Sequence, residues 1–189
     1  MNLTTLAHSQ ESKPAPMPLL LVQAFVNTWD GERGTDLLLE PASASSWLTE
    51  AGLWQGTPDA AGLYVARSVR AGIRALLWAN NGGPDPAPAD LQPLKELAQA
   101  SRPDLEIGSA GQVSLGPGSG DGLGTQLVRL LLVIRDVQRD GSWARLKACH
   151  NPECRWAFFD RSHSRAGTWC DMAACGNRSK NRSLRERQR

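Results

Sequence analysis

The fold of this chain is decided by the stretch Cys149-His150-Asn151-Pro152-Glu153-Cys154, which is followed by a second cysteine pair, Cys170 and Cys175. Four residues separate the cysteines of each pair, 15 residues separate the two pairs, and the sequence holds 4 Cys in all. In a structural zinc site each close pair forms one knuckle, and the spacer lets the chain turn back so that both knuckles meet around one tetrahedral metal. The spacing therefore predicts one structural Zn²⁺ per chain, bound by the four thiolates.

Other roles for these residues compete with this interpretation. Two disulfides would use the same four cysteines, but they are typical of secreted chains. The first 17 residues lack the basic and apolar regions of a signal peptide, so we expect a cytoplasmic protein with reduced thiols. His150 is a further candidate ligand, but four thiolates already complete the shell, so we expect it to be exposed. A complete shell also leaves no position for a catalytic water, and we do not expect an enzyme.

Charge is distributed unevenly along the chain. Residues 145–189 carry 11 Lys or Arg against four Asp or Glu, a net of +7, whereas residues 1–144 carry 10 against 15, a net of −5. The formal net charge of the whole chain is only +2. Such asymmetry indicates a basic segment that meets a polyanion.

The segment after the last cysteine is predicted to be a basic helix. Asn177 is a suitable N-cap, and no helix breaker follows it. Arginines spaced by four, three and four residues fall on one helical face, with further basic residues beside it. A solvated basic tail is the alternative, because Leu184 is the only large apolar residue here. The candidate nucleic-acid-binding residues are Arg178, Lys180, Arg182, Arg185, Arg187 and Arg189.

The chain before the cysteines is predicted to be mainly helical, because apolar residues recur in it at helical spacing. Thr57 is expected to cap the longest early helix, with Pro58 at its first position. Helices are expected over residues 18–29, 43–51, 58–78, 90–100 and 123–139. Short strands are expected over residues 36–40, 105–107, 112–115, 145–148 and 155–160.

Together these patterns predict an α+β protein in three parts. Residues 1–17 are expected to be a disordered tail. Residues 18–140 are expected to form a helical domain with a small antiparallel β element. Residues 144–189 are expected to form a treble-clef-like zinc-knuckle module that ends in the basic helix. The longest apolar runs are far too short to span a bilayer, so we expect no membrane association.

Particular motifs resemble a known family. The run Cys175-Gly176-Asn177-Arg178 spells the signature of the CGNR zinc-finger family, and residues 149–187 resemble the C-terminal module of that family. The stretch Phe158-Phe159-Asp160-Arg161-Ser162 belongs to this resemblance. The N-terminal region is similar to the domain usually paired with the module. Its matches are Phe25-Val26-Asn27-Thr28, Trp47-Leu48, Ala51-Gly52-Leu53 and Val69-Arg70.

The resemblance implies a bacterial, stress-induced transcription regulator that binds DNA through the zinc module and so lies at the nucleoid. Phosphate contacts would supply most of the affinity. The N-terminal domain would sense a small-molecule effector or dimerise. Asn27 and Arg70 are candidate effector contacts at family-matching positions; alternatively, each caps a helix or pairs within the core. The alternative function is a zinc-stabilised module that binds RNA or a protein partner without reading a DNA sequence.

Overall fold

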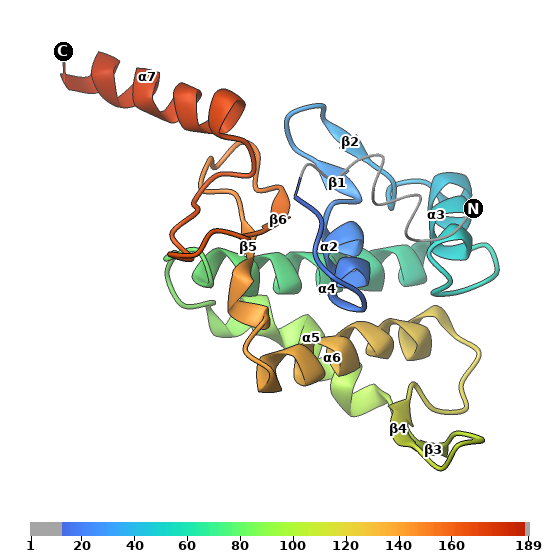
Figure 1. Ribbon diagram of the computed structural model, residues 1–189. Helices are drawn as coiled ribbons and strands as arrows, with labels where there is room; N and C mark the ends of the chain where they lie inside the picture. The colour runs from blue at the N-terminus through green and yellow to red at the C-terminus, as the bar shows by residue number, and fades with distance from the viewer. Residues whose placement is uncertain (1–12, 188–189) are drawn as a thin grey trace.

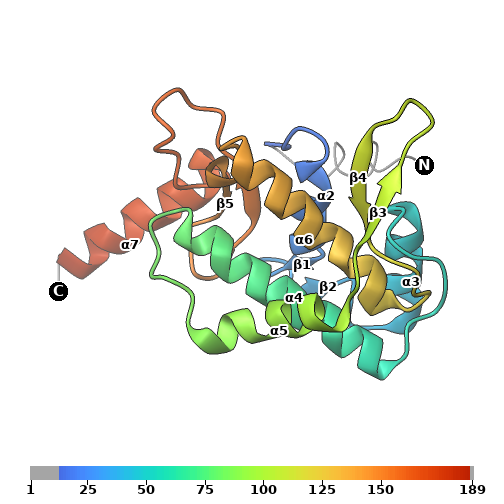
Figure 2. The same cartoon turned by 90° about the horizontal axis from the view of Figure 1, so that it is seen from below.

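The computed structural model describes residues 13–187, without the side chains of Ser183, Leu184, Glu186 and Arg187. It confirms the predicted α+β class, with a helical body and three two-stranded antiparallel sheets among these residues (Figures 1 and 2). The α-helices are α2 (Leu19–Val26), α3 (Pro41–Glu50), α4 (Ala60–Ala79), α5 (Pro88–Ala100), α6 (Leu123–Arg139) and α7 (Asn177–Arg187). The paired strands are β1 (Trp29–Asp30) with β2 (Thr35–Asp36), β3 (Asp104–Ile107) with β4 (Val113–Gly116), and β5 (Leu146–Ala148) with β6 (Ala157–Phe159).

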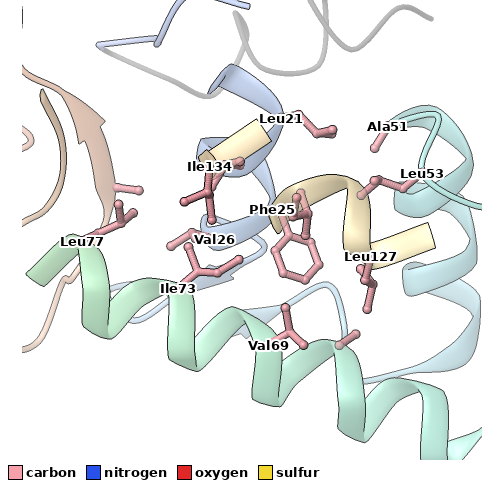
Figure 3. Close-up of a cluster of buried hydrophobic side chains, with 14 of the residues drawn as sticks. Leu21, Phe25, Val26, Ala51, Leu53, Val69, Ile73, Leu77, Leu127 and Ile134 are labelled. Carbon is pink, nitrogen blue, oxygen red and sulfur yellow. The ribbon is translucent and has the colours of Figure 1, made fainter. Parts of the chain in front are cut away.

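Helix α4 forms the centre of the body. Its residues Val69, Ile73 and Leu77 are fully buried and recur at helical spacing, so one face of the helix meets the core. In Figure 3 this face lies opposite Phe25 of α2 and Leu127 of α6. Helix α5 packs on α4 from another side. No helix among residues 13–187 is both long enough and apolar enough to cross a membrane.

Two local predictions for the N-terminal region are wrong. Helix α4 begins at Ala60 with Asp59 as its N-cap, because the Asp59 carboxylate accepts the Gly62 N–H at 2.7 Å; Thr57 has no capping role. The predicted strand 36–40 ends after Asp36. The Asp36 carboxylate accepts the Leu38 N–H at 2.9 Å and turns the backbone there.

The β5–β6 hairpin joins the helical body to the cysteine cluster. Successive residues of β6 face opposite ways, so Ala157 and Phe159 pack in the helical core whereas Phe158 packs with the cysteines. Leu146 and Ala148 of β5 also lie in the helical core. Residues from both predicted domains therefore share one core.

The start of the described chain is packed, whereas the sequence predicted a disordered tail over residues 1–17. The Phe159 N–H donates to the Lys13 carbonyl at 3.0 Å, and Lys13 Nζ donates to the Trp169 carbonyl at 2.9 Å. The Ala15 N–H donates to Gln23 Oε1 at 2.6 Å. These bonds hold residues 13–15 against the hairpin edge and α2, and residues 1–12 lie outside the described part of the chain.

Candidate metal centre and basic helix

The four cysteines meet at one point. Their sulfurs all lie within 4.8 Å of one another, every cysteine is buried, and none forms a disulfide. Cys170 Sγ lies 3.6 Å from Cys154 Sγ and 3.7 Å from Cys175 Sγ. Four thiolates at about 2.3 Å from a tetrahedral zinc stand about 3.8 Å apart. The spacing of the sulfurs thus fits zinc and is far too long for a disulfide, whose S–S length is about 2.05 Å.

Asn151 shapes the first knuckle. Its carbonyl accepts the N–H groups of Cys154 and Arg155 at 3.0 and 3.1 Å, which closes the turn over the metal position. Its side-chain Nδ2 points across the cluster and lies 3.8 Å from Cys175 Sγ. Arg155 takes a left-handed backbone conformation, with φ 51°, as the chain leaves the turn. Asn151 therefore connects the two knuckles.

Asp171 shapes the second knuckle. Its carboxylate accepts the Ala173 and Ala174 N–H groups at 2.7 and 3.4 Å and starts a π-helical turn, Met172–Gly176, that contains Cys175. A Cβ at Gly176 would lie 2.5 Å from Met172 Sδ, so a larger residue there would displace the half-exposed Met172 side chain. The turn continues directly into α7. The predicted N-cap role of Asn177 is therefore wrong: its backbone is helical, and its side chain donates to the Ala173 carbonyl.

The close packing of the four thiols makes the ionisation of one of them easier and the ionisation of the next one harder. Hydrogen bonds from Cys154 and Cys170 to the Cys149 sulfur lower the pKa of Cys149 far below that of a free thiol. The pKa of Cys154 is raised by its hydrogen bonds with Cys149 and Cys170 and then by burial, because further ionisation would crowd negative charge. A divalent cation at this point removes the repulsion and holds all four groups as thiolates.

A buried ion pair braces the loop between the knuckles. Lys147 Nζ lies 2.9 Å from Asp160 Oδ2, and both side chains are buried. Asp160 also accepts the N–H groups of Ser162 and Gly167. Burial opposes the ionisation of Asp160, but these hydrogen bonds outweigh it, and the pKa of Asp160 lies well below its usual range. This pair fixes residues 160–167 just before Cys170.

Amide side chains of the helical body also form hydrogen bonds with the β5–β6 hairpin. Asn27 pairs with Ala157 in both directions: Nδ2 donates to the Ala157 carbonyl at 2.9 Å, and Oδ1 accepts the Ala157 N–H at 2.7 Å. Asn81, just after α4, donates to the carbonyls of Ala148 and Thr168 at 2.8 and 2.9 Å. These side chains position β5 and β6 relative to α2 and α4.

The two candidate effector contacts are engaged by protein groups. Asn27 is buried and paired with Ala157, as above. Arg70 donates two hydrogen bonds to the Asp36 carboxylate, at 2.6 and 2.7 Å, and one to Thr28 Oγ1 at 3.0 Å. These contacts are those of residues that pair within a core.

Helix α7 lies at the edge of the molecule and extends away from the body (Figures 1 and 2). Two members of its arginine face have carboxylate partners. Arg178 lies 3.0 Å from Glu32 of the β1–β2 turn, and Arg182 lies 3.1 Å from Glu153 of the first knuckle. The side chains of Arg178 and Arg182 remain 51% and 48% exposed, so they stay accessible to a polyanion.

The remaining candidate nucleic-acid-binding residues are not members of these two ion pairs. Lys180 and Arg185 are exposed on α7. The side chain of Arg187 and the whole of Arg189 lie outside the described part of the chain. His150 is exposed, as expected, and its ring lies 4.7 Å from Trp78 and 5.6 Å from Trp169. His150 is thus part of an aromatic contact between the body and the zinc module.

Glu32 was not predicted as a site residue. Its Oε1 lies 3.2 Å from Cys175 Sγ, while its other carboxylate oxygen accepts from Arg178. Partial burial opposes its ionisation, but the hydrogen bond from Arg178, together with one from the Cys175 thiol in the metal-free chain, outweighs it and lowers the pKa of Glu32. No sequence pattern joins residues this far apart. For Asn151 and Asp171, by contrast, a position one or two residues after a cysteine was an available signal.

A helical body with a four-cysteine module and a terminal basic helix defines a zinc-binding protein of the zinc-finger class. Residues 145–188 match the CGNR zinc finger, and residues 20–137 match the ABATE family, which is described as "putative stress-induced transcription regulator". The second match covers more than half of the chain, so the chain belongs to the ABATE family, and it carries a CGNR zinc finger. No curated protein matches the chain. The zinc-finger match and the four buried cysteines fit one structural zinc ion.

Proposed function

We propose that this protein is a transcription regulator that binds duplex DNA through the arginine face of α7. The observation that carries the proposal is the continuity between metal site and helix. The turn that contains Cys175 runs into α7 without a break, so zinc bound by the cysteines fixes the direction of the helix. The family description agrees with a regulator. We extend the proposal to a bacterial stress response, with the protein in the cytoplasm at the nucleoid.

The charges on α7 suit phosphate contacts. Arg178, Arg182 and Arg185 follow one another at helical spacing and are exposed. Phosphates of a duplex would compete with Glu32 and Glu153 for the first two arginines. Exposed ion pairs are weak, so the carboxylates do not prevent this exchange. Counterion release then makes the affinity fall steeply with salt.

The zinc has a structural role in this proposal, and the protein is not an enzyme. Four thiolates complete a tetrahedral shell and leave no open position for water or substrate. The N-terminal domain acts as a sensor or a dimerisation unit. Its shared core with β5 and β6 supports communication between the domain and the zinc module.

The test is a titration of labelled duplex DNA with the zinc-loaded full chain at several salt concentrations. The double variant Arg182→Ala, Arg185→Ala should flatten the log–log salt slope by about two units, because about 0.9 counterion is released per phosphate contact. Arg102→Ala with Arg139→Ala is the matched control, since both residues are exposed and neither lies on α7. Zinc content should stay the same in all three proteins.

Two results would count against the proposal. Equal affinity and equal slope for wild type and the α7 variant would make α7 a solvated tail. Tighter binding of a single-stranded or structured RNA than of duplex DNA at the same salt would favour the RNA-binding alternative. Heparin added as a competitor measures the part of the affinity that any polyanion provides.

A further inference from the structure

A cavity of about 420 Å³ lies in the helical body, remote from the cysteines. It opens between α4, the end of α5 and the start of α6. Its volume falls in the range of small-molecule sites, about 300–1,000 Å³. Neither the proposed nucleic-acid contacts nor the metal site uses it.

The cavity results from small residues on facing helices. Helices α4 and α5 approach closely at Gly72, where an added Cβ would lie 2.7 Å from the Asp90 carbonyl oxygen. Farther along α4 and α5, the residues that line the cavity include the small residues Ser68 and Ala100. Gly124 lies at the start of α6, and a Cβ added there would meet nothing within 4 Å. The side chains in this region are therefore too small to close the space.

The lining is apolar with a few polar groups. Val65, Leu97 and Pro93 supply apolar surface, and Tyr64, a residue that is 67% exposed, contributes a ring. Ser68 and Thr125 also line the cavity and each carries a hydroxyl group.

The charge of the lining disfavours an anion. Among the described residues that line the cavity, none is Lys, Arg or His, and the one ionisable acid is Glu96. The Glu96 carboxylate accepts the Gln92 amide at 2.9 Å. An anionic ligand would meet this carboxylate with no cation to offset it.

We propose that this cavity binds an uncharged, largely apolar small molecule that carries a ring and one hydrogen-bonding group. The ring packs on Tyr64, Val65 and Leu97, and the polar group meets the hydroxyl of Ser68. This inference rests on the proposed sensor role of the N-terminal domain. Helix α4 carries the cavity residues near its start and ends next to Asn81, which holds β5.

The test uses two probes with the same aromatic body and the zinc-loaded full chain without nucleic acid. N-phenyl-1-naphthylamine is uncharged, and 8-anilinonaphthalene-1-sulfonate adds one negative charge to the same rings. The uncharged probe should bind saturably, with one molecule per chain, and at least tenfold more tightly than the sulfonate. Fluorescence titration measures both affinities.

Cavity-filling variants locate the binding. Ala100→Leu and Gly124→Leu should each weaken the uncharged probe at least tenfold, and Gly124→Leu also improves helix propensity, which protects folding. Ala98→Leu is the matched control, because Ala98 is exposed on α5 and does not line the cavity. Unchanged affinity in both filled variants, non-saturable binding, or equal affinity for the sulfonate would overturn the proposal. Since no DNA is present, failure here leaves the DNA-binding result intact, and the reverse also holds.

Discussion

Replacing Asn27 by Ala tests whether this residue holds the β5–β6 hairpin or serves a ligand. In the structure its amide donates to the Ala157 carbonyl at 2.9 Å and accepts the Ala157 N–H at 2.7 Å. The carbonyl keeps a second donor, Gln23 Nε2 at 3.2 Å. The Ala157 N–H has no other partner within residues 13–187 and is buried, so the substitution leaves it unsatisfied.

The expected loss of unfolding free energy follows from this difference between the carbonyl and the N–H group of Ala157. An unsatisfied buried donor costs about 1–3 kcal/mol, and the lost donation to the carbonyl adds about 1 kcal/mol. We therefore expect Asn27→Ala to lower the free energy of unfolding by about 2–4 kcal/mol. With a slope of roughly 2–3 kcal/mol per molar urea, the midpoint should fall by about 1–2 M.

The assay is urea unfolding of the zinc-loaded full chain at fixed free zinc, followed by circular dichroism. Gln138→Ala is the control, since this amide is exposed on α6 and its loss should change stability by less than about 0.5 kcal/mol. An Asn27→Ala midpoint equal to that of the control would refute the structural role and favour the predicted effector contact. A large shift would assign Asn27 to the interface between helical body and zinc module.

Two further predictions concern charged pairs. Glu32→Gln frees Arg178 and should raise duplex-DNA affinity about two- to fivefold at low salt, whereas Glu50→Gln, an equal charge change at an exposed site, should have a smaller effect; equal gains would show that only net charge matters. Asp160→Asn leaves Lys147 without its buried counter-charge and should cost about 3 kcal/mol in urea unfolding. Because the folded-state pKa of Asp160 is lowered, its contribution is complete above the unfolded-state pKa of about 3.9. The cost should therefore be the same at pH 6 and pH 8, and a cost that disappears in this window would contradict the pair.

Local patterns were sufficient for the main elements. The apolar period of α6 predicted residues 123–139, which are the bounds observed, and the cysteine spacing predicted a cluster that the structure assembles. The strand at 36–40 was wrong because a carboxylate hydrogen bond from Asp36 outweighed the apolar run Leu37–Leu39. Propensity reasoning does not include such a side-chain bond to the backbone.

Long-range contacts could not be predicted from the sequence. The pairing of Asn27 with Ala157 and of Glu32 with Arg178 joins segments more than 100 residues apart. The cavity near Ala100 and Gly124 likewise depends on how three helices pack, which no local period encodes. The predicted division at residue 140 stays a prediction, although β5 and β6 contribute to the helical core.

The most direct test of the account is the duplex-DNA affinity of the full chain with and without zinc at one near-physiological salt concentration. The account predicts one zinc per chain as purified and at least a tenfold loss of affinity when a chelator removes it, with recovery when zinc is restored. The arginines are present in both states, so only the anchoring of α7 through Cys175 differs. Equal affinity of the zinc-free and zinc-loaded chains would contradict the claim that the metal site positions the basic helix for DNA.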